Sequence, residues 1–117
     1  MVKRPVVGLT ENIILLSKNQ NQATKQLIAR IDTGATLSSI DQKLAKELEL
    51  GPVIREKIVK QQTGKTRRPV IKATITIKNL KITDEFSVAD RKNMKFPVLI
   101  GQNILKKGAF MVDPLIK

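Results

Sequence analysis

Apolar and polar residues alternate along much of the chain, with the period of two that is typical of half-buried β-strands. The clearest alternation runs from 70 to 78, where Ile71, Ala73, Ile75 and Ile77 share one side. Shorter runs predict further strands at 5–9, 11–17, 25–31, 53–60, 80–88, 96–100 and 109–112. Polar or glycine-containing segments predict turns at 8–12, 19–22, 61–66 and Asn79. The pattern therefore predicts a mostly β protein.

One segment has helical periodicity instead of strand periodicity. Its apolar residues stand at positions 40, 44 and 48, and Gly51-Pro52 ends the run. Ser39 and Gln42 have the spacing of a capping box, which predicts a helix start. We therefore expect one short helix at about 40–50, and a short helical turn at about 102–107. So little helix among so many strands favours a sheet that closes into a barrel or folds as a sandwich.

The length of 117 residues predicts a single domain spanning 1–117. The longest apolar run, at 13–16, is far shorter than the ~18 residues that a membrane helix needs. The first residues are not followed by the apolar stretch and cleavage site of a signal peptide. We therefore expect a cytoplasmic protein with no membrane partner.

Cysteine, histidine and tyrosine are absent from the sequence. Without cysteine and histidine the chain can form neither a disulfide framework nor a Cys/His zinc site. A Ser-His or Cys-His nucleophile is excluded as well, because the base is missing. Any general acid or base must be a carboxylate, a lysine or a chain terminus. The sequence implies no metal and no cofactor.

The net charge of +12 would attract anions, whether nucleic acid or acidic protein segments. A basic, merely solvated surface would have the same composition. Proteins that bind single-stranded nucleic acid usually add stacking aromatic residues. Here the three phenylalanines, at 86, 96 and 110, stand among apolar residues and look like core. Nucleic acid therefore stays an open but less favoured partner.

The segment Asp32-Thr33-Gly34-Ala35 is the strongest candidate for chemistry. It follows the strand predicted at 25–31, and its glycine permits a sharp turn that would hold a carboxylate in a fixed direction. An ordinary aspartate that bonds nearby turn amides would fit the same residues. A second segment, about 65 residues further along, favours the chemical interpretation. It reads Phe96-Pro97-Val98-Leu99-Ile100-Gly101-Gln102-Asn103-Ile104-Leu105.

Together the two segments resemble the retropepsin-like aspartic proteases. In that family the Asp-Thr-Gly loop is braced by a later strand of two apolar residues and a glycine, which Leu99, Ile100 and Gly101 match. Gln102 stands where the family commonly has an arginine. Segments 67–71, 85–91 and 108–114 are similar to the branch labelled "ATP-dependent zinc protease", found near ATP-grasp ligases that append glutamates. The resemblance covers about 25–114 and implies a closed β-barrel or sandwich.

The resemblance implies hydrolysis of peptide bonds by two carboxylates that share one proton. Two like charges at ~4 Å and an effective dielectric of ~20 repel by about 4 kcal/mol, or roughly three pK units, so one carboxylate stays protonated. Because the chain has one Asp-Thr-Gly, we expect a homodimer in which each subunit contributes Asp32. Thr33 is expected to bridge the two-fold axis. The expected supporting residues are Thr33, Gly34, Ala35, Leu99, Ile100 and Gly101.

By the same resemblance, the hairpin tip predicted at 61–66 is the flap that closes over a bound peptide. The expected flap and substrate-binding residues are Gly64, Lys65, Arg67 and Arg68, with Lys60 beside them. Their charges would favour an acidic or glutamate-rich substrate, whereas a basic hairpin without function is the alternative. Asp90 and Arg91 form either a local ion pair or a substrate contact. For the whole protein, the alternative is a non-catalytic retropepsin-fold module that docks acidic protein or nucleic acid.

Overall fold

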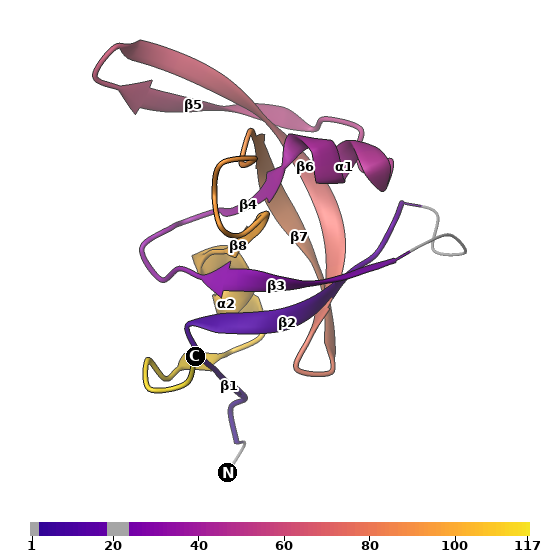
Figure 1. The fold of residues 1–117 in the computed structure, drawn as a ribbon, viewed down its shortest axis with the longest axis vertical. Coiled ribbons are helices and arrows are strands. Elements are labelled where there is room, and N and C mark those ends of the chain that lie inside the picture. Colours follow the sequence, from indigo (N-terminus) through magenta and orange to yellow (C-terminus); the bar gives the residue numbers. More distant parts are fainter. Residues whose placement is uncertain (1–2, 19–23) are drawn as a thin grey trace.

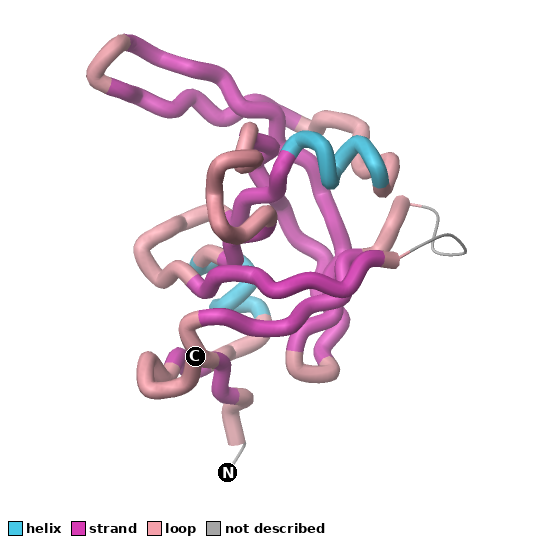
Figure 2. Tube along the Cα trace, in the orientation of Figure 1, coloured by secondary structure: helices cyan, strands magenta, loops and turns pink. Residues whose placement is uncertain are grey.

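The computed structural model describes residues 3–18 and 24–117. Half of them lie in strands and few lie in helices, which confirms the mostly β prediction (Figures 1 and 2). The strands are β1 (Val6–Val7), β2 (Thr10–Leu15), β3 (Lys25–Ile31), β4 (Ser38–Asp41), β5 (Arg55–Gln61), β6 (Gly64–Ile77), β7 (Leu80–Ala89), β8 (Val98–Ile100) and β9 (Met111–Val112). The helices are α1 (Gln42–Glu47) and α2 (Gln102–Lys107). The turn predicted at 19–22 lies outside the described residues.

Seven strands form the main sheet in the order β2-β3-β8-β4-β7-β6-β5, and β1 and β9 form a small parallel sheet. β2 also pairs with β6, but only where residues 13–15 meet residues 75–77. The first half of the 14-residue β6, residues 64–70, continues away with β5 as a long hairpin (Figure 1). The sheet is therefore sandwich-like, which confirms one of the two predicted forms. The other form, a closed barrel, is wrong because β2 covers too little of β6 to complete one.

The period-two pattern correctly identified the inner face of β6. Ile71, Ala73, Ile75 and Ile77 are all buried, and they pack in one core with Phe86. The other core phenylalanine is at 110, while the one at 96 is half-buried. The turn predicted at Asn79 is present, and both of its central residues have positive φ angles. In the described part of the chain, no helix is long and apolar enough to cross a membrane.

The helix predicted at about 40–50 is shorter, and the proposed capping box is wrong. Ser39 and Ile40 belong to β4, which lies between β8 and β7, so that Ile40 is fully buried against strand neighbours on both sides. Packing within the sheet outweighs the weak local preference for helix. The N-cap is Asp41, whose Oδ2 accepts a hydrogen bond from the Lys43 amide at 3.1 Å.

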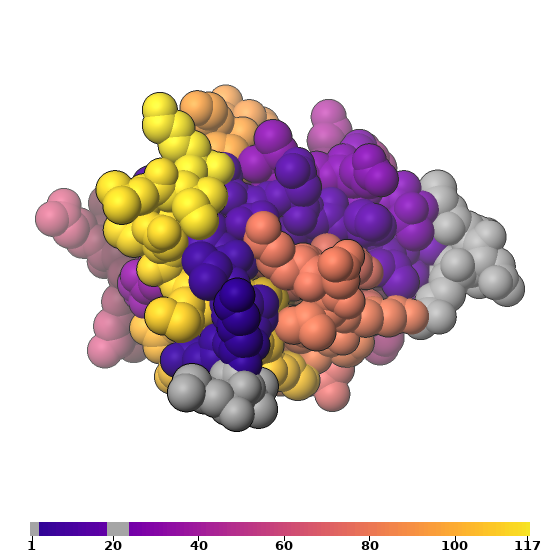
Figure 3. Space-filling model, turned by 90° about the horizontal axis from the view of Figure 1, so that it is seen from below, coloured from indigo at the N-terminus to yellow at the C-terminus, as the bar shows by residue number. Residues whose placement is uncertain are grey.

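The remaining predicted elements differ mainly in length. α2 occupies the predicted range 102–107, but the strand predicted at 5–9 is reduced to β1 and the one predicted at 96–100 to β8. Only Gly8 and Leu9 connect β1 to β2, so the predicted turn at 8–12 is shorter as well. The N-terminal and C-terminal segments lie side by side, next to the β6–β7 turn (Figure 3).

Candidate active site

Asp32 directly follows β3 and is fixed by its backbone. Its amide donates to the Ile100 carbonyl on β8 at 2.9 Å, and its carbonyl accepts from the Ala35 amide at 3.3 Å. The side chain is held too, because Oδ1 accepts a hydrogen bond from the Gly34 amide at 2.9 Å. Asp32 is half-buried, whereas Thr33 and Gly34 are exposed at the tip of the loop. The loop thus presents one oriented carboxylate at the surface.

Gly101 braces this loop from beneath. A Cβ atom at position 101 would lie 2.8 Å from the carbonyl oxygens of both Ala35 and Leu37, which leaves room for glycine alone. The next residue, Gln102, donates from its amide to the Ala35 carbonyl at 2.7 Å and from its side chain to the Thr33 carbonyl at 2.7 Å. The structure therefore brings together all seven residues expected in the active-site loop and its support: Asp32, Thr33, Gly34, Ala35, Leu99, Ile100 and Gly101.

Sequence reasoning missed a polar network under the loop. The buried Ser38 hydroxyl accepts from the Gly101 amide at 2.9 Å and donates to Asn103 Oδ1 at 2.8 Å. The Asn103 side chain also donates to the Glu85 carbonyl at 2.9 Å, so it links α2 to β7. The helix start predicted at Ser39 concealed this role, because Ser38 belongs to the strand β4. The buried Ser38 and the half-buried Asn103 satisfy each other and hold the loop, β8 and α2 in one arrangement.

The hairpin of β5 and β6 confirms the predicted tip. Gly64 has a φ of 134°, which favours glycine, and a Cβ atom there would meet nothing within 4 Å. The hairpin itself extends away from the other strands (Figure 1). Gly64 and Lys65 are exposed, and no hydrogen bond or ion pair within the described residues joins them to the Asp32 loop. The two neighbouring arginines differ. Arg67 forms an ion pair with Glu56 at 3.7 Å, whereas Arg68 forms no ion pair in the described part of the chain.

Arg91 lies near Asp32 although the two are far apart in sequence. Its Nε donates to the Phe96 carbonyl at 3.0 Å, and its amide donates to Asp41 Oδ1 at 2.8 Å. Asp90 pairs with Lys92 at 3.8 Å, so of the two alternatives for Asp90 and Arg91 the local ion pair is absent from the described residues.

The charges around Arg91 identify its neighbours. Burial has the largest effect and lowers the pKa of Arg91 from its ordinary value. The carboxylates of Asp41 and Asp32 raise this pKa, whereas the guanidinium groups of Arg30 and Arg68 lower it. Arg30 was not recognised from the sequence. Because it stands two residues before Asp32 in β3, its place in the predicted strand could have revealed it.

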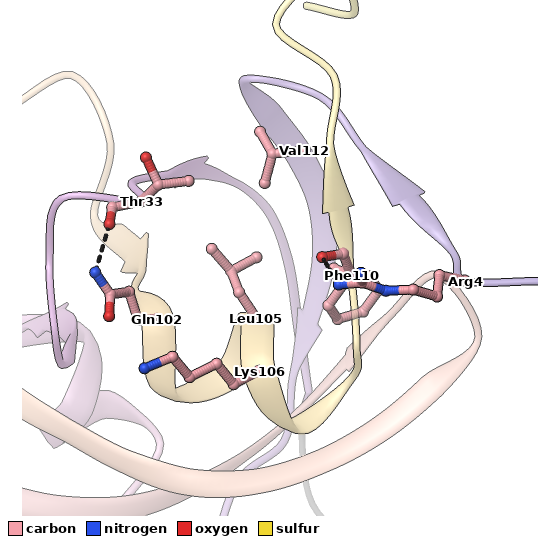
Figure 4. A pocket seen from close by; sticks show the side chains of 7 residues that line it. All are labelled: Arg4, Thr33, Gln102, Leu105, Lys106, Phe110 and Val112. Atoms are coloured by element: carbon pink, nitrogen blue, oxygen red, sulfur yellow. Dashed lines mark hydrogen bonds between the residues drawn. The ribbon is translucent and has the colours of Figure 1, made fainter.

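A pocket of about 290 Å³ opens beside the tip of the Asp32 loop, next to Thr33 (Figure 4). Leu105, Phe110 and Val112 make it largely apolar, and Thr33 and Gln102 form one edge. Arg4 and Lys106 complete the lining. An apolar recess therefore adjoins the residue that was expected to meet a second subunit.

Comparison with known families identifies the chain. The model of the RimB-like family, described as retropepsin-like aspartic endopeptidase RimB, matches residues 41–117. The chain belongs to the RimB-like family. The matched segment includes Gly101 and α2 but begins after the Asp-Thr-Gly loop, so that loop is assigned from the structure and the sequence motif. No curated protein matches the chain.

Solved structures place this RimB-like chain in the retropepsin fold. The EIAV protease, solved with the inhibitor HBY-793, has a TM-score of 0.65 at 21% identity, over 97% of this chain and 95% of its own. The simian foamy virus (mac) protease has a TM-score of 0.62 at 15% identity, over 83% of this chain and 91% of its own. A Legionella pneumophila protein of unknown function (DUF785) has a TM-score of 0.64 at 19% identity, over 98% of this chain and 97% of its own. At such identities the likeness shows the fold alone.

Proposed function

We propose that the protein is an aspartic endopeptidase whose active site contains two Asp32 carboxylates, one from each subunit of a homodimer. The observation that carries the proposal is the position of Asp32. It lies half-buried on an Asp-Thr-Gly loop, oriented by the Gly34 amide and braced by Gly101, within a retropepsin fold. One carboxylate cannot act as base and acid at once, so the chemistry requires a second copy.

The two carboxylates have different tasks. The ionised one removes a proton from a water molecule, whose oxygen then bonds to the scissile carbonyl carbon. The protonated one donates its proton to the carbonyl oxygen, which gives a tetrahedral diol. The diol collapses as the amine leaves with the proton that the first carboxylate took from the water, and a diol hydroxyl returns a proton to the second carboxylate. Because the two carboxylates repel, a single proton is shared by the pair in the resting enzyme. The Gly34 amide occupies Oδ1, which leaves the other oxygen of Asp32 for the water.

The exposed loop tip supports the dimer. Thr33 already uses its carbonyl to accept from Gln102 within its own subunit, which leaves its hydroxyl available to a partner's loop. In the family pattern an arginine commonly follows the glycine that Gly101 matches. In this chain Gln102 stands at that position, and its side-chain amide donates to the Thr33 carbonyl.

An acidic or glutamate-rich peptide is the substrate class that we propose. The net charge of +12 favours anionic ligands, and the β5–β6 hairpin carries basic residues on both strands. This hairpin would act as the flap that closes over the peptide. A second candidate, a binding module without hydrolysis, is favoured by the same charge.

The test is to replace Asp32 by Asn and measure cleavage of a peptide mixture that includes glutamate-rich sequences. We expect cleavage to fall below detection while sedimentation still shows a folded dimer. Asp84→Asn, which makes the same chemical change on β7, is the control and should retain full activity. Cleavage by the Asp32→Asn protein would contradict the proposal. If the unaltered protein cleaves nothing yet retards nucleic acid, and Asp32→Asn retards it equally, the binding module is correct.

A further inference from the structure

Strand pairing places five residues in one row across the sheet. Arg30 on β3 lies opposite Leu99 on β8, and Leu99 lies opposite Ser39 on β4. Ser39 in turn lies opposite Ser87 on β7, and Ser87 lies opposite Val70 on β6. Directly paired residues project from the same face of a sheet. We call these five residues the transverse row.

The transverse row lies on the same face as Asp32. Side chains alternate along a strand, so Asp32, two residues after Arg30, projects to the same side, as does Arg68, two residues before Val70. The opposite face is the core, to which the intervening residues belong: Ile31, Ile40, Ile71 and Ile100. The row therefore runs from beside the candidate catalytic carboxylate to the base of the β5–β6 hairpin.

Ser39, in the middle of the row, carries an unpartnered hydroxyl group. The residue is only 7% exposed, and its Oγ is the one buried side-chain polar atom among the described residues without a hydrogen-bond partner. Its neighbour Ser87 donates to the Ser38 carbonyl at 3.4 Å. Buried polar groups are almost always hydrogen-bonded, so this hydroxyl has a free hydrogen bond to offer a bound molecule. The Ser39 hydroxyl is a donor placed on the face of Asp32.

Three arginines surround this face without carboxylate partners. Arg30 and Arg68 each lower the pKa of Arg91 by repulsion, so both guanidinium groups lie within electrostatic range of Arg91. None of them forms an ion pair within residues 3–18 and 24–117. By contrast, Arg55 is paired with Glu85 at 2.7 Å. An entering anion would relieve the repulsion among the three arginines.

Two carboxylates, those of Asp41 and Asp32, act on Arg91 from nearby, but neither forms an ion pair with it in the described residues. Asp41 accepts from the Arg91 amide with Oδ1 and from the Lys43 amide with Oδ2, so its oxygens are engaged by backbone groups. Asp32 is the proposed catalytic group. Arg91 is held by the Phe96 carbonyl through one nitrogen, Nε, which leaves its terminal nitrogens to bind a ligand.

We propose that Ser39, Arg68 and Arg91 form a subsite that binds the side-chain carboxylate of a glutamate or aspartate of the substrate, next to the bond that is cleaved. The inference rests on the proposed function, because it identifies the residues by which the Asp32 site selects an acidic peptide. Guanidinium groups and a hydroxyl are suitable donors for a carboxylate, and such charge-assisted hydrogen bonds are strong. Leu99, half-buried in the same row, offers an apolar contact to the methylene groups of the bound side chain.

The experiment measures binding rather than cleavage, on the full chain carrying Asp32→Asn. Two labelled peptides of equal length are compared by fluorescence anisotropy, one rich in glutamate and one with every glutamate replaced by glutamine. We expect the glutamate peptide to bind about tenfold more tightly or better, as the loss of one charged hydrogen bond implies. Ser39→Ala and Arg68→Gln should each reduce this preference about threefold or more. Arg91→Lys, which keeps the charge but loses the planar donors, should reduce it too.

Lys81→Gln is the matched control. It removes one positive charge from β7 near the β6–β7 turn, far from the transverse row, and should leave the preference unchanged. Ser39→Ala removes a hydroxyl that has no partner, so its melting temperature should not fall, and loss of binding cannot then be assigned to unfolding.

The possible results separate the subsite from the proposed function. Equal binding of the two peptides, an unchanged preference in Ser39→Ala, or an equal loss in Lys81→Gln would overturn the subsite. An oligonucleotide that competes as well as the glutamate peptide would overturn it as well. Cleavage by the unaltered protein without any glutamate preference would leave the proposed function standing and the subsite wrong. A glutamate preference that depends on Ser39 and Arg68, without cleavage, would support the subsite and contradict the peptidase.

Discussion

Gly34 and Gly101 both lie beside Asp32, and the structure requires them for different reasons. A Cβ atom at Gly101 would meet the backbone of Ala35 and Leu37 at 2.8 Å, and backbone cannot move aside without shifting the loop. A Cβ atom at Gly34 would meet only the carboxylate oxygen of Asp32, at 3.2 Å. The first contact concerns the fold, and the second concerns the orientation of one side chain.

We therefore predict that the Gly101 variant mainly loses stability and that the Gly34 variant mainly loses activity. Gly101→Ala should lower the free energy of unfolding by about 3 kcal/mol, because the added methyl group overfills a tight site. Gly34→Ala should cost less than about 1 kcal/mol but remove most of the cleavage activity, since it displaces Asp32 Oδ1 from the Gly34 amide. Urea unfolding and peptide cleavage measure the two quantities. A Gly101→Ala protein as stable as the unaltered one would contradict the close approach.

At the scale of elements, Asp41 joins three parts of the chain. It is the last residue of β4, it caps α1 through the Lys43 amide, and it holds the loop after β7 through the Arg91 amide. One carboxylate thus fixes where the strand ends, where the helix begins and where Arg91 lies. The placement of the proposed subsite depends on this junction.

Asp41→Ala should therefore reduce both stability and selectivity. We expect a loss of about 1–2 kcal/mol in the free energy of unfolding, the usual cost of removing an N-cap. The preference for the glutamate peptide should fall as well, because the loop that carries Arg91 loses its anchor. Asp41→Asn retains a good capping residue and should lose less. Asp90→Ala, on the same loop but exposed, is the control, and an equal loss in that variant would refute the argument.

At the scale of the whole molecule, the proposed active site exists only in the dimer. Each subunit presents one oriented carboxylate, and the exposed loop tip adjoins an apolar recess lined by Leu105, Phe110 and Val112. Activity per milligram should therefore fall when the protein is diluted through the dissociation constant of the dimer. Cleavage and sedimentation are measured over the same dilution series. Constant specific activity from a protein with the mass of a monomer would contradict the shared site.

The net charge of +12 leads to a second prediction for the whole molecule. Salt shortens the screening length from about 10 Å at 0.1 M to about 3 Å at 1 M. Cleavage of a glutamate-rich peptide should therefore decline steeply as salt is added, because several basic groups attract it. The matched glutamine peptide, measured in parallel, should be much less affected. Turnover of the glutamate peptide that is insensitive to salt would contradict electrostatic selection.

Much of the candidate active-site loop was predictable because its parts are local. A strand that ends in Asp-Thr-Gly, and a second strand that ends in Gly101, are both visible as short motifs. The Ser38–Asn103 network and the neighbours of Ser39 were not predictable, because their partners are far away in sequence. The local spacing even predicted a helix start at Ser39. Its actual place, at the centre of the transverse row, depends on pairing with the distant strands β8 and β7.

The sequence by itself determined the alternation of buried and exposed positions, the helical turn at 102–107 and the presence of one Asp-Thr-Gly loop. These features depend on the chemistry of neighbouring residues, which is read along the chain. Only the tertiary structure decided that β4 is a strand and that Arg30, Arg68 and Arg91 surround one face. It also decided that the Ser39 hydroxyl is left without a partner. The physical reason is that burial and charge proximity depend on which distant segments pack together, and no local pattern encodes that choice.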